Sequence, residues 1–310
     1  MEYDLIIIGS GPAGMTAGVF AARKGLRTLI VAKEPGGQVN WTSDIENYMG
    51  FKEIDGQALM ERFQQQVKEH QLEAKQAEVC MVRKEGELFK AETATGEQLT
   101  AKTVIICSGK TPRTLNIKGE TEFRNRGVSY CSTCDAPLFR ETEVAVVGGG
   151  NSAVKAVLDL ANYAKAIHLI YREDRLTADA ILQQRLTPLD HLTQYPGRTV
   201  VEIAGSNAVE QIKLEETGSG RQTVLPVQGV FIEIGLVPNT GFVDQAVARN
   251  EAEEIQIDCH CRTNVPGLYA AGDVSSVPEK QIIIAAGEGA KAAIRAWEYL
   301  MNTPEFEVKH

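Results

Sequence analysis

Short runs of consecutive apolar residues, each followed by a glycine-rich turn, are the clearest pattern along this chain. Residues 3–8 are almost entirely apolar, as expected for a strand that is buried on both faces of a parallel sheet. Residues 15–24 are rich in alanine and read as a helix, and a second apolar run covers residues 28–31. The order strand, helix, strand predicts a βαβ unit with parallel strands.

The turn inside this unit reads Gly9-Ser10-Gly11-Pro12-Ala13-Gly14, which has the pattern G-x-G-x-x-G. The first glycine allows a tight turn, the second lets backbone amides approach a pyrophosphate, and the third lets the helix pack closely on the strand. The N-terminus of the helix then faces the phosphate charge. Glu34 stands twenty residues beyond Gly14, where an acidic side chain can accept a hydrogen bond from a ribose hydroxyl.

The same arrangement occurs a second time, about one domain later. Residues 143–147 form an apolar run that ends in Gly148-Gly149-Gly150-Asn151-Ser152-Ala153, the G-x-G-x-x-A form of the turn. Residues 154–163 read as a helix and residues 166–171 as a strand, and Glu173 stands twenty residues past Ala153. One such turn is a weak indication, whereas two copies in a full strand–helix–strand–acid context predict two dinucleotide-binding domains.

A third apolar run ends in Gly272-Asp273 and indicates how the two domains share the chain. If this strand belongs to the first domain, the second domain is inserted into the first. Turn-rich stretches around Pro112 and Pro238 are the candidate joints. We therefore predict an α/β fold with two Rossmann-like dinucleotide-binding domains, one formed by residues 1–114 and 242–310 and the other by residues 115–241.

Composition agrees with a folded protein of this kind. A length of 310 residues predicts about two domains, and 43% hydrophobic residues exclude disorder as the main state. No apolar run approaches the ~20 residues that span a bilayer. The start Met-Glu-Tyr-Asp lacks the basic region of a secretory signal, so we expect a cytoplasmic protein without a membrane partner. A net charge of −9 argues against nucleic-acid binding.

The six cysteines are too few for a disulfide scaffold. Cys131-Ser132-Thr133-Cys134 is a C-x-x-C pair followed by Asp135; such a pair can close a small disulfide ring, and the adjacent carboxyl is a candidate proton donor and acceptor. Two alternatives are a pair of inert core cysteines and half of a zinc site completed by Cys259-His260-Cys261.

Cys80 and Cys107 lie in strand-like runs, and we expect both to be core thiols.

Charge is distributed unevenly around this pair. Residues 110–140 hold six basic and three acidic side chains, so this segment carries +3, which leaves −12 for the rest of the chain. A basic surface near the pair would attract an acidic protein. Scattered, solvated charges are the alternative interpretation.

Taken together, these motifs resemble the low-molecular-weight thioredoxin reductase family and are similar to the flavoprotein core of alkyl hydroperoxide reductase. The resemblance covers nearly the whole chain, and it rests on residues 9–14, Gly36-Gly37-Gln38, Glu46-Asn47, 131–135, 148–153, Gly272-Asp273 and Gln281-Ile282. It implies a homodimer that binds FAD. Electrons would pass from a reduced pyridine nucleotide through FAD to the C-x-x-C pair, and then to thioredoxin or a thioredoxin-like protein.

The resemblance also implies roles for single residues. Cys134 would meet the flavin, Cys131 would attack the disulfide of the partner, and Asp135 would handle the proton. The FAD-binding residues would be Gly9, Gly11, Pro12, Ala13, Gly14, Glu34, Gly37, Gln38, Asn47, Gly272, Asp273, Gln281 and Ile282. Among them, Asp273 would reach the ribityl chain. The pyridine-nucleotide site would comprise Gly148, Gly150, Asn151, Ser152, Ala153 and Glu173. No metal is expected.

Departures from the family bear on the electron donor. The NADPH-dependent form carries His-Arg-Arg-x-x-x-Arg, whereas here Glu173 and Thr177 replace two of the three arginines. A carboxylate repels a 2′-phosphate and accepts a hydrogen bond from a 2′-hydroxyl, which favours NADH over NADPH. Lys155 also stands where relatives usually carry glutamate, and Ala136 where glycine is usual.

These departures leave open a reductase that takes electrons from ferredoxin, which the basic segment would suit, although the intact turn at 148–153 argues for a nucleotide. An NADH oxidase-type flavoprotein and a flavin-binding redox sensor without turnover are further alternatives. The chain begins at the first glycine turn, without the N-terminal thioredoxin-like domains of the alkyl hydroperoxide reductase flavoprotein. We therefore expect it to pass electrons to a separate protein.

Overall fold

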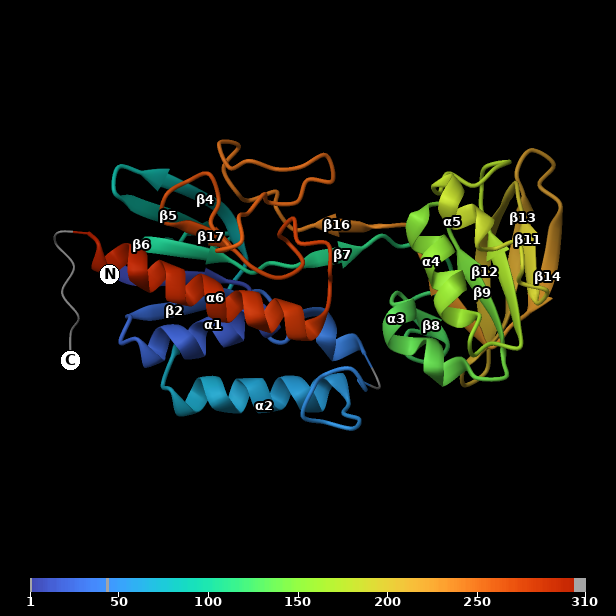
Figure 1. The fold of residues 1–310 in the computed structure, drawn as a ribbon, viewed down its shortest axis with the longest axis horizontal. Coiled ribbons are helices and arrows are strands. Elements are labelled where there is room, and N and C mark those ends of the chain that lie inside the picture. Colours follow the sequence, from blue (N-terminus) through green and yellow to red (C-terminus); the bar gives the residue numbers. More distant parts are fainter. Residues whose placement is uncertain (1, 43–44, 304–310) are drawn as a thin grey trace. The chain divides into compact units, whose positions relative to one another are not determined.

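The computed structural model describes residues 2–42 and 45–303, which divide into two compact units (Figure 1). The first unit contains the described residues up to Thr111 and those from Val237 onward, and the second runs from Pro112 to Leu236. The chain thus leaves the first unit and returns to it after the second is complete. The expected boundaries, after residues 114 and 241, lie a few residues further along the chain.

The first unit is built on a seven-stranded sheet with the order β3-β2-β1-β6-β5-β4, in which β17 also pairs with β6. Its strands are β1 (Glu2–Ile8), β2 (Thr28–Ala32), β3 (Glu73–Gln76), β4 (Val79–Glu85), β5 (Leu88–Thr93), β6 (Gln98–Ile106) and β17 (Leu268–Ala270). The pairs that involve β1, β2, β3 and β17 are parallel, and β4–β5 and β5–β6 are antiparallel. Because β17 follows the second unit in the chain, this sheet needs residues from both sides of the insertion.

Both faces of this sheet are buried, which explains why β1 reads as a continuous apolar run. Successive side chains of a strand point to opposite faces. Leu5 and Ile7 accordingly belong to one core cluster, whereas Ile6 and Ile8 belong to another. The helices α1 (Pro12–Arg23) and α6 (Ile282–Met301) contribute small side chains to the first cluster. Figure 1 shows α1, α6 and α2 (Gly56–Glu69) on the same side of the sheet.

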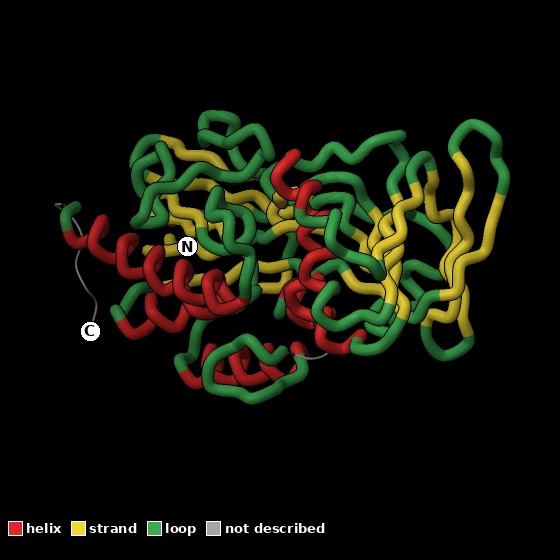
Figure 2. The backbone as a smooth tube through the Cα atoms, turned by 45° about the vertical axis from the view of Figure 1, so that its right-hand side comes forward, coloured by secondary structure: helices red, strands yellow, loops and turns green. Residues whose placement is uncertain are grey.

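The second unit contains a parallel five-stranded sheet, an antiparallel three-stranded sheet and short helices. The parallel sheet has the order β11-β10-β9-β15-β8 and the other has the order β12-β13-β14. Figure 2 shows strands of both units in yellow. Its strands are β8 (Val128–Ser129), β9 (Glu143–Val147), β10 (Ala166–Ile170), β11 (Leu192–Tyr195), β12 (Arg198–Gly205), β13 (Val209–Glu216), β14 (Gln222–Pro226) and β15 (Gly229–Ile232). Its helices are α3 (Ser132–Asp135), α4 (Asn151–Leu160), α5 (Ala180–Gln184) and the 3-10 turn η2 (Ala136–Phe139).

Two short strands, β7 (Lys110–Pro112) and β16 (Leu236–Pro238), pair with each other where the chain passes between the units. They contain the two prolines around which the joints were expected. A 3-10 turn, η1 (Gly37–Trp41), follows β2 in the first unit. None of the helices in residues 2–42 and 45–303 has the length and apolar character needed to cross a membrane.

Three local expectations differ from the structure. Helix α1 begins at Pro12 and α4 at Asn151, each three residues before the start expected from composition, because the end of each glycine turn already forms the first helical turn. Proline is compatible with that position since it needs no amide partner there. Cys80 is exposed rather than buried, because it lies on the edge strand β4 at an irregularity in the pairing between Val79 and Met81. Cys107 is buried, as expected.

The close packing of α6 on α1 gives a test of this fold. A methyl group on Gly289 would lie 2.0 Å from the carbonyl oxygen of Ala13, whereas one on Gly287 would meet nothing within 4 Å. We expect Gly289→Ala to lower the free energy of unfolding by about 2 kcal/mol, because backbone must move to accept it. Gly287→Ala should instead be neutral or stabilise by up to ~1 kcal/mol, since alanine favours helix. Urea denaturation of both variants measures the difference, and equal stabilities would contradict the packing.

Candidate functional site

The glycines of the first turn are required for different structural reasons: some are closely approached by neighbouring backbone, and one is not. A Cβ atom on Gly9 would lie 2.1 Å from the carbonyl oxygen of Cys107, and one on Gly14 would lie 1.9 Å from the carbonyl oxygen of Gly9. These two positions are therefore closed by neighbouring backbone. On Gly11 the nearest atom to a Cβ would be 3.9 Å away, so the middle of the turn is open on its outer side. The turn leaves space where a phosphate group could approach the backbone.

The start of α1 lies directly behind this open space. Gly11 is the N-cap residue and no side chain caps the helix there, so the first amides of α1 remain available to an anion. The loop after β2 is held beside the turn, because the amide of Gly36 donates to the carbonyl oxygen of Ser10 at 2.7 Å. Glu34 lies in this loop and is exposed, as the expected ribose contact requires.

Other expected contacts come together from distant parts of the chain. The side-chain amide of Asn47 donates to Oε1 of Gln281 at 3.1 Å, although 234 residues separate them. Gln281 is the N-cap of α6, which begins at Ile282. Gln38 donates to the carbonyl oxygen of Lys110 at 2.5 Å. The segment after β2 is thereby held to the start of β7 and to the start of α6.

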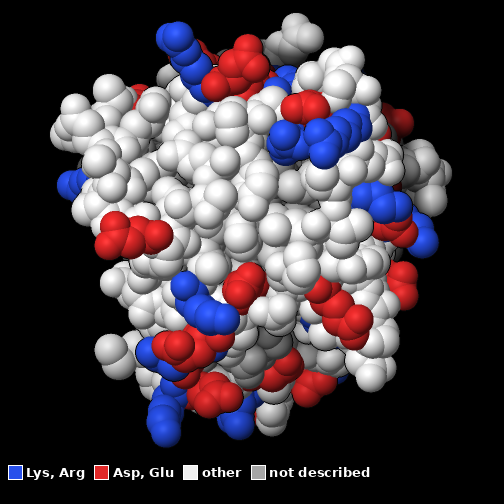
Figure 3. Space-filling model, turned by 90° about the vertical axis from the view of Figure 1, so that its right-hand side faces the viewer, with Lys and Arg blue, Asp and Glu red and all other residues white. Residues whose placement is uncertain are grey.

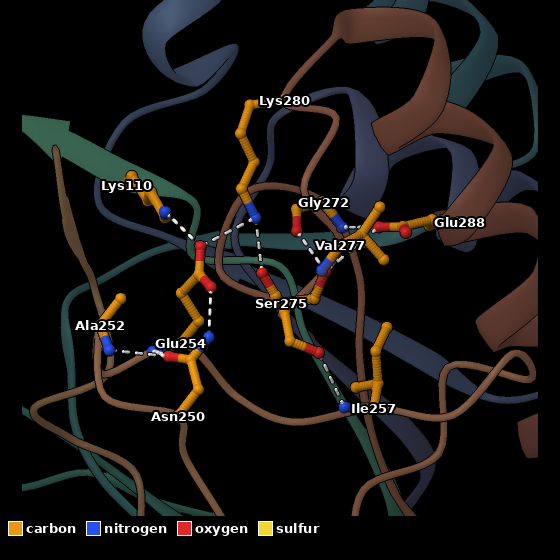
Figure 4. A network of polar contacts seen from close by, with 11 residues as sticks. Lys110, Asn250, Ala252, Glu254, Ile257, Gly272, Ser275, Val277, Lys280 and Glu288 are labelled. Carbon is orange, nitrogen blue, oxygen red and sulfur yellow. Dashed lines mark hydrogen bonds and ion pairs between the residues drawn. The ribbon is translucent and has the colours of Figure 1, made fainter. Parts of the chain in front are cut away.

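Gly272 and Asp273 follow β17 in the same unit. Gly272 has a φ of +77°, and its amide donates to the buried carboxyl of Glu288 at 2.7 Å, as Figure 4 shows. Burial raises the pKa of the Glu288 carboxyl. Burial also raises the pKa of Asp273, with the cationic groups of Lys280 and Lys110 acting in the opposite direction. The carboxyl of Asp273 thus gains from any hydroxyl group that donates a hydrogen bond to it.

Two lysines share one carboxylate, as Figure 4 shows, and the charges of all three groups act on Asp273. Oε1 of Glu254 lies 2.5 Å from Nζ of Lys110 and 3.1 Å from Nζ of Lys280, and none of the three side chains is more than 17% exposed. Burial acts to raise the pKa of Glu254, but hydrogen bonds from Lys110, Asn250 and Lys280 outweigh it and hold the pKa below its ordinary value. This network fixes the segment at 250–254 to the start of β7 and to the loop before α6.

The residues of the first unit fit the adenine dinucleotide that the sequence predicts. An open glycine turn, an uncapped helix start and an exposed acid in the loop after β2 suit the phosphates and a ribose. The partly buried carboxyl of Asp273 suits hydroxyl donors. FAD contains each of these groups, so the arrangement agrees with an FAD site.

The cysteine pair lies in the second unit. Cys131 and Cys134 form a disulfide with a Cα–Cα distance of 5.4 Å, and both are half-buried. The hydroxyl of Ser129 donates to the Asp135 carboxylate at 2.6 Å and accepts from the amide of Cys131 at 3.1 Å. Ser129 ends β8, so the parallel sheet positions both the acid and the first cysteine of the pair.

The second glycine turn repeats the geometry of the first. A Cβ atom on Gly148 would lie 2.3 Å from the carbonyl oxygen of Glu233, whereas one on Gly150 would meet nothing closer than 3.9 Å. Gly150 is the N-cap of α4 and is not capped by a side chain. Asn151 forms two hydrogen bonds with Asp179, one through its side-chain amide at 2.9 Å and one from the Asp179 backbone at 2.8 Å. Ala153 is fully buried.

The acidic residue expected at a ribose lies beside this turn. Oε2 of Glu173 would be 3.9 Å from a Cβ on Gly149. Arg172, the residue directly before Glu173, forms an ion pair with the Glu173 carboxylate at 3.0 Å. A hydrogen bond from Arg172 lowers the pKa of Glu173, so the carboxylate is ionised at neutral pH. Lys155 is exposed on α4.

Several polar residues of these sites were not expected from the sequence. Lys110 was counted with the basic segment, but it is buried and paired with Glu254. Lys118 pairs with Glu202 at 2.7 Å, but its side chain is 80% exposed. Of these two lysines, only Lys110 is withdrawn from the expected basic surface. The face in Figure 3 shows acidic and basic side chains around a broad uncharged area. Lys280 and Glu288 carried no motif, although a glutamate within the small, apolar stretch of α6 could have indicated a buried acid.

The residues that could have formed a zinc site do not gather. Cys259 is exposed and Cys261 is buried, and both are free thiols. In the part of the chain that the structure describes, no group of three or more histidine, cysteine, aspartate or glutamate side chains is placed to hold a metal ion. The thiol of Cys261 instead packs against the carbonyl oxygen of Glu288 at 3.7 Å.

Comparisons with known proteins show to which family the chain is similar. A family model described as pyridine nucleotide-disulphide oxidoreductase matches residues 3–293. An alkyl hydroperoxide reductase subunit of Staphylococcus aureus is 42% identical over 301 residues, which are 97% of this chain and 59% of that protein. A Bacillus subtilis protein named NADH dehydrogenase is 40% identical over 300 residues, with the same two shares. This chain therefore spans about 59% of the length of these curated relatives.

Solved structures show the same fold. The thioredoxin reductase of Streptococcus pyogenes is similar with a TM-score of 0.92 and 38% identity, over 97% of this chain and 98% of that one. The expected α/β fold with two Rossmann-like domains, and the resemblance to the thioredoxin reductases, are thereby confirmed.

The network around Glu254 gives a prediction for stability. Glu254→Gln leaves two buried lysines without their shared carboxylate, so we expect it to lower the free energy of unfolding of the first unit by about 3 kcal/mol. Glu78→Gln is the matched control, because Glu78 pairs with Lys33 where both side chains are more than half exposed. It should cost less than ~1 kcal/mol.

Urea denaturation at several pH values measures both effects. Because the pKa of Glu254 is lowered, its contribution is present above the ordinary glutamate range and is lost as the pH falls through the lowered value. The difference between wild type and Glu254→Gln should shrink on acidification. Equal costs for the two variants at neutral pH would contradict the network.

Proposed function

Because this chain belongs to the pyridine nucleotide-disulphide oxidoreductase family, we propose that it is an FAD-dependent disulfide reductase. It takes electrons from NADH in preference to NADPH and passes them through FAD and the Cys131–Cys134 pair to a thioredoxin-like protein. The observation that carries the proposal is the disulfide between these two cysteines, formed in a unit that also holds a second dinucleotide-type turn. The family binds FAD and uses a reduced pyridine nucleotide.

The first unit supplies the FAD site. The open turn at Gly11 and the start of α1 would bind the pyrophosphate, Glu34 the adenosine ribose, and Asp273 the ribityl hydroxyls. Gln38, Asn47, Gln281 and the start of α6 would hold the flavin. When bound, FAD supplies a carrier that accepts two electrons from a nicotinamide and donates them to a disulfide. The protein determines the position of each group and the charge around it.

The cysteine pair transfers two electrons to the partner. The Cys131 thiolate attacks one sulfur of the partner disulfide, forming a mixed disulfide and releasing the other partner sulfur as a thiolate. Cys134 then attacks Cys131, which restores the Cys131–Cys134 disulfide and releases the second partner sulfur. The partner disulfide becomes two thiols while the enzyme dithiol becomes a disulfide, so electrons balance. Two protons from the dithiol pass to the partner thiols.

Asp135 is the group proposed to move these protons. Its carboxylate accepts a hydrogen bond from the hydroxyl of Ser129, and that hydroxyl accepts a hydrogen bond from the backbone amide of Cys131. This chain of contacts fixes the carboxylate one residue from Cys134, where it can take a proton from a thiol and return it.

The donor proposal rests on Glu173. Its carboxylate lies beside the second glycine turn and is paired with Arg172, so a 2′-phosphate would meet a negative charge and an arginine that is already engaged. A free 2′-hydroxyl can donate to the same carboxylate. One of the relatives carries the name NADH dehydrogenase, which supports this choice. We propose, from the resemblance alone, that the protein works as a cytoplasmic homodimer.

The first prediction concerns the attacking thiol. Cys131→Ser should abolish reduction of a thioredoxin disulfide, because no nucleophile remains to form the mixed disulfide, while reduction of bound FAD by its donor persists. Cys80→Ser is the matched control and should leave both activities unchanged, since Cys80 is exposed on the edge strand of the other unit. Insulin turbidity with thioredoxin measures the first activity and anaerobic flavin absorbance the second. Survival of thioredoxin reduction in Cys131→Ser would refute the mechanism.

The second prediction concerns the donor. Under anaerobic conditions, one equivalent of NADH should bleach the flavin absorbance promptly, and NADPH should need at least tenfold higher concentration. Glu173→Arg should reverse that order through KM, because an arginine pairs with a 2′-phosphate. Bleaching by reduced ferredoxin, with no response to either nucleotide, would reject the nucleotide donor and support the ferredoxin alternative. Bleaching without steady-state turnover of any disulfide would instead indicate a sensor.

A further inference from the structure

Glu233 lies where the second glycine turn and the cysteine pair come together within one unit. It directly follows β15, and its amide donates to the carbonyl oxygen of Val147 at the end of β9 at 2.8 Å. Its own carbonyl oxygen occupies the space that a side chain on Gly148 would need. The backbone of Glu233 is therefore fixed against the turn, and its side chain is the part that can form further contacts.

The side chain of Glu233 binds both neighbours at once. The hydroxyl of Ser152, within the turn, donates to Oε2 of Glu233. The backbone amide of Ser132, between the two cysteines, is close enough to the same carboxyl to lower its pKa. One carboxyl thus connects the first residues of α4 to the amide that directly follows Cys131.

A second carboxylate holds the cysteine loop from the other side. Oδ2 of Asp159 accepts from the hydroxyl of Ser132 at 2.9 Å and from that of Thr133 at 3.2 Å. Asp159 and Ser152 both belong to α4. Both residues between the cysteines are therefore bound by carboxylates, and α4 reaches Glu233 through the hydroxyl of Ser152 and through the charge of Asp159.

We propose that Glu233 is a positioning residue that couples the occupant of the second glycine turn to the reactivity of the Cys131–Cys134 pair. The inference rests on the proposed function, because it requires a working dithiol and an adenine dinucleotide at the turn. It adds a residue that touches neither electron donor nor disulfide partner, and that acts through Ser132 and Ser152.

The coupling follows from charge. Reduction of the disulfide creates a thiolate at Cys131, and an ionised carboxyl that occupies the neighbouring amide opposes this new charge. Burial raises the pKa of Glu233 to about 7, opposed by the hydrogen bonds from Ser152 and Ser132 and reinforced by the charge of Asp159. Glu233 is therefore mostly neutral at pH 6 and mostly ionised at pH 8. The Cys131 thiolate should form more readily when Glu233 is neutral.

The same charge acts on the turn. A pyrophosphate at the start of α4 would compete for the Ser152 hydroxyl and would be repelled by an ionised Glu233. Binding there should favour the protonated carboxyl, which also favours the thiolate. Since coupling between two sites is reciprocal, a dinucleotide at the turn and a thiolate at Cys131 should stabilise each other.

Alkylation of Cys131 tests this in the FAD-loaded protein after reduction with dithiothreitol and its removal under anaerobic conditions. The rate of reaction with iodoacetamide follows the thiolate fraction, and one pKa unit corresponds to a tenfold change. We expect Glu233→Gln to react at the wild-type rate at pH 6 and about three- to tenfold faster at pH 8. Glu215→Gln is the matched control, since it removes one charge from β13 of the same unit, and it should follow the wild type at both pH values.

A second measurement uses NAD⁺, which cannot donate electrons, as the probe of the turn. At pH 8, saturating NAD⁺ should accelerate alkylation of the wild type at least threefold and have no effect on Glu233→Gln. Ser152→Ala removes a hydrogen-bond donor that lowers the pKa of the Glu233 carboxyl. In this variant, the slowing of alkylation by ionised Glu233 should therefore begin at a higher pH than in the wild type. This variant decides the matter if Glu233→Gln does not fold.

The outcomes separate the two proposals. Equal alkylation rates for wild type and Glu233→Gln at pH 8, with an unchanged pH profile for Ser152→Ala, would overturn the role of Glu233 while leaving the reductase intact. A wild-type pair that dithiothreitol cannot reduce would instead overturn the proposed function. Alkylation that depends on Glu233 but not on NAD⁺ would refute the coupling to the turn.

Discussion

The approach of backbone to backbone at the two glycine turns is the constraint on which the rest of the structure depends. At Gly9, Gly14 and Gly148, a carbonyl oxygen fills the place of a side chain. This contact lets each helix start directly at the end of its strand, with its amides pointing away from the sheet. The middle glycine of each turn stays open. Binding capacity and tight packing therefore come from the same few residues, and a larger side chain at the closed positions would remove both.

Two buried acids, one in each unit, lie in opposite electrostatic surroundings. In the first unit, Glu254 is surrounded by two lysines and an amide, which keep it ionised. Such a group holds segments in place and does not change charge near neutral pH. In the second unit, Glu233 has hydroxyl and amide donors and another acid, Asp159, as its named neighbours. A carboxyl in that setting changes charge within the physiological range. The ionised acid lies in the unit with the proposed FAD site, and the titrating one lies in the unit that contains the Cys131–Cys134 disulfide.

The local sequence pattern predicted the secondary-structure elements well, but it could not predict which distant residues come into contact. The turns, the strands beside them and the cysteine pair are each written within some twenty consecutive residues, so spacing alone identified them. The family resemblance alone indicated that Asn47 and Gln281 serve the same site, and their mutual hydrogen bond was not predicted. Lys110 and Glu254 are 144 residues apart, and nothing at either position shows that they meet. Cys80 was misplaced because an apolar run does not reveal whether its strand lies at the edge of a sheet. Glu233 follows an ordinary strand, and its importance arises only when folding brings Ser132 and Ser152 to it.

The insertion of one unit into the other also determines the order in which a growing chain can fold. The second unit is complete once residue 236 has been synthesised, whereas the first still lacks β17 and α6 at that time. Until they arrive, the carboxyl half of β6 has an unpaired edge, and the apolar face later covered by α6 is open to solvent. Such surfaces are where nascent chains aggregate or recruit chaperones. During synthesis, all residues of the cysteine-bearing unit are therefore available before the other unit has its full set of residues.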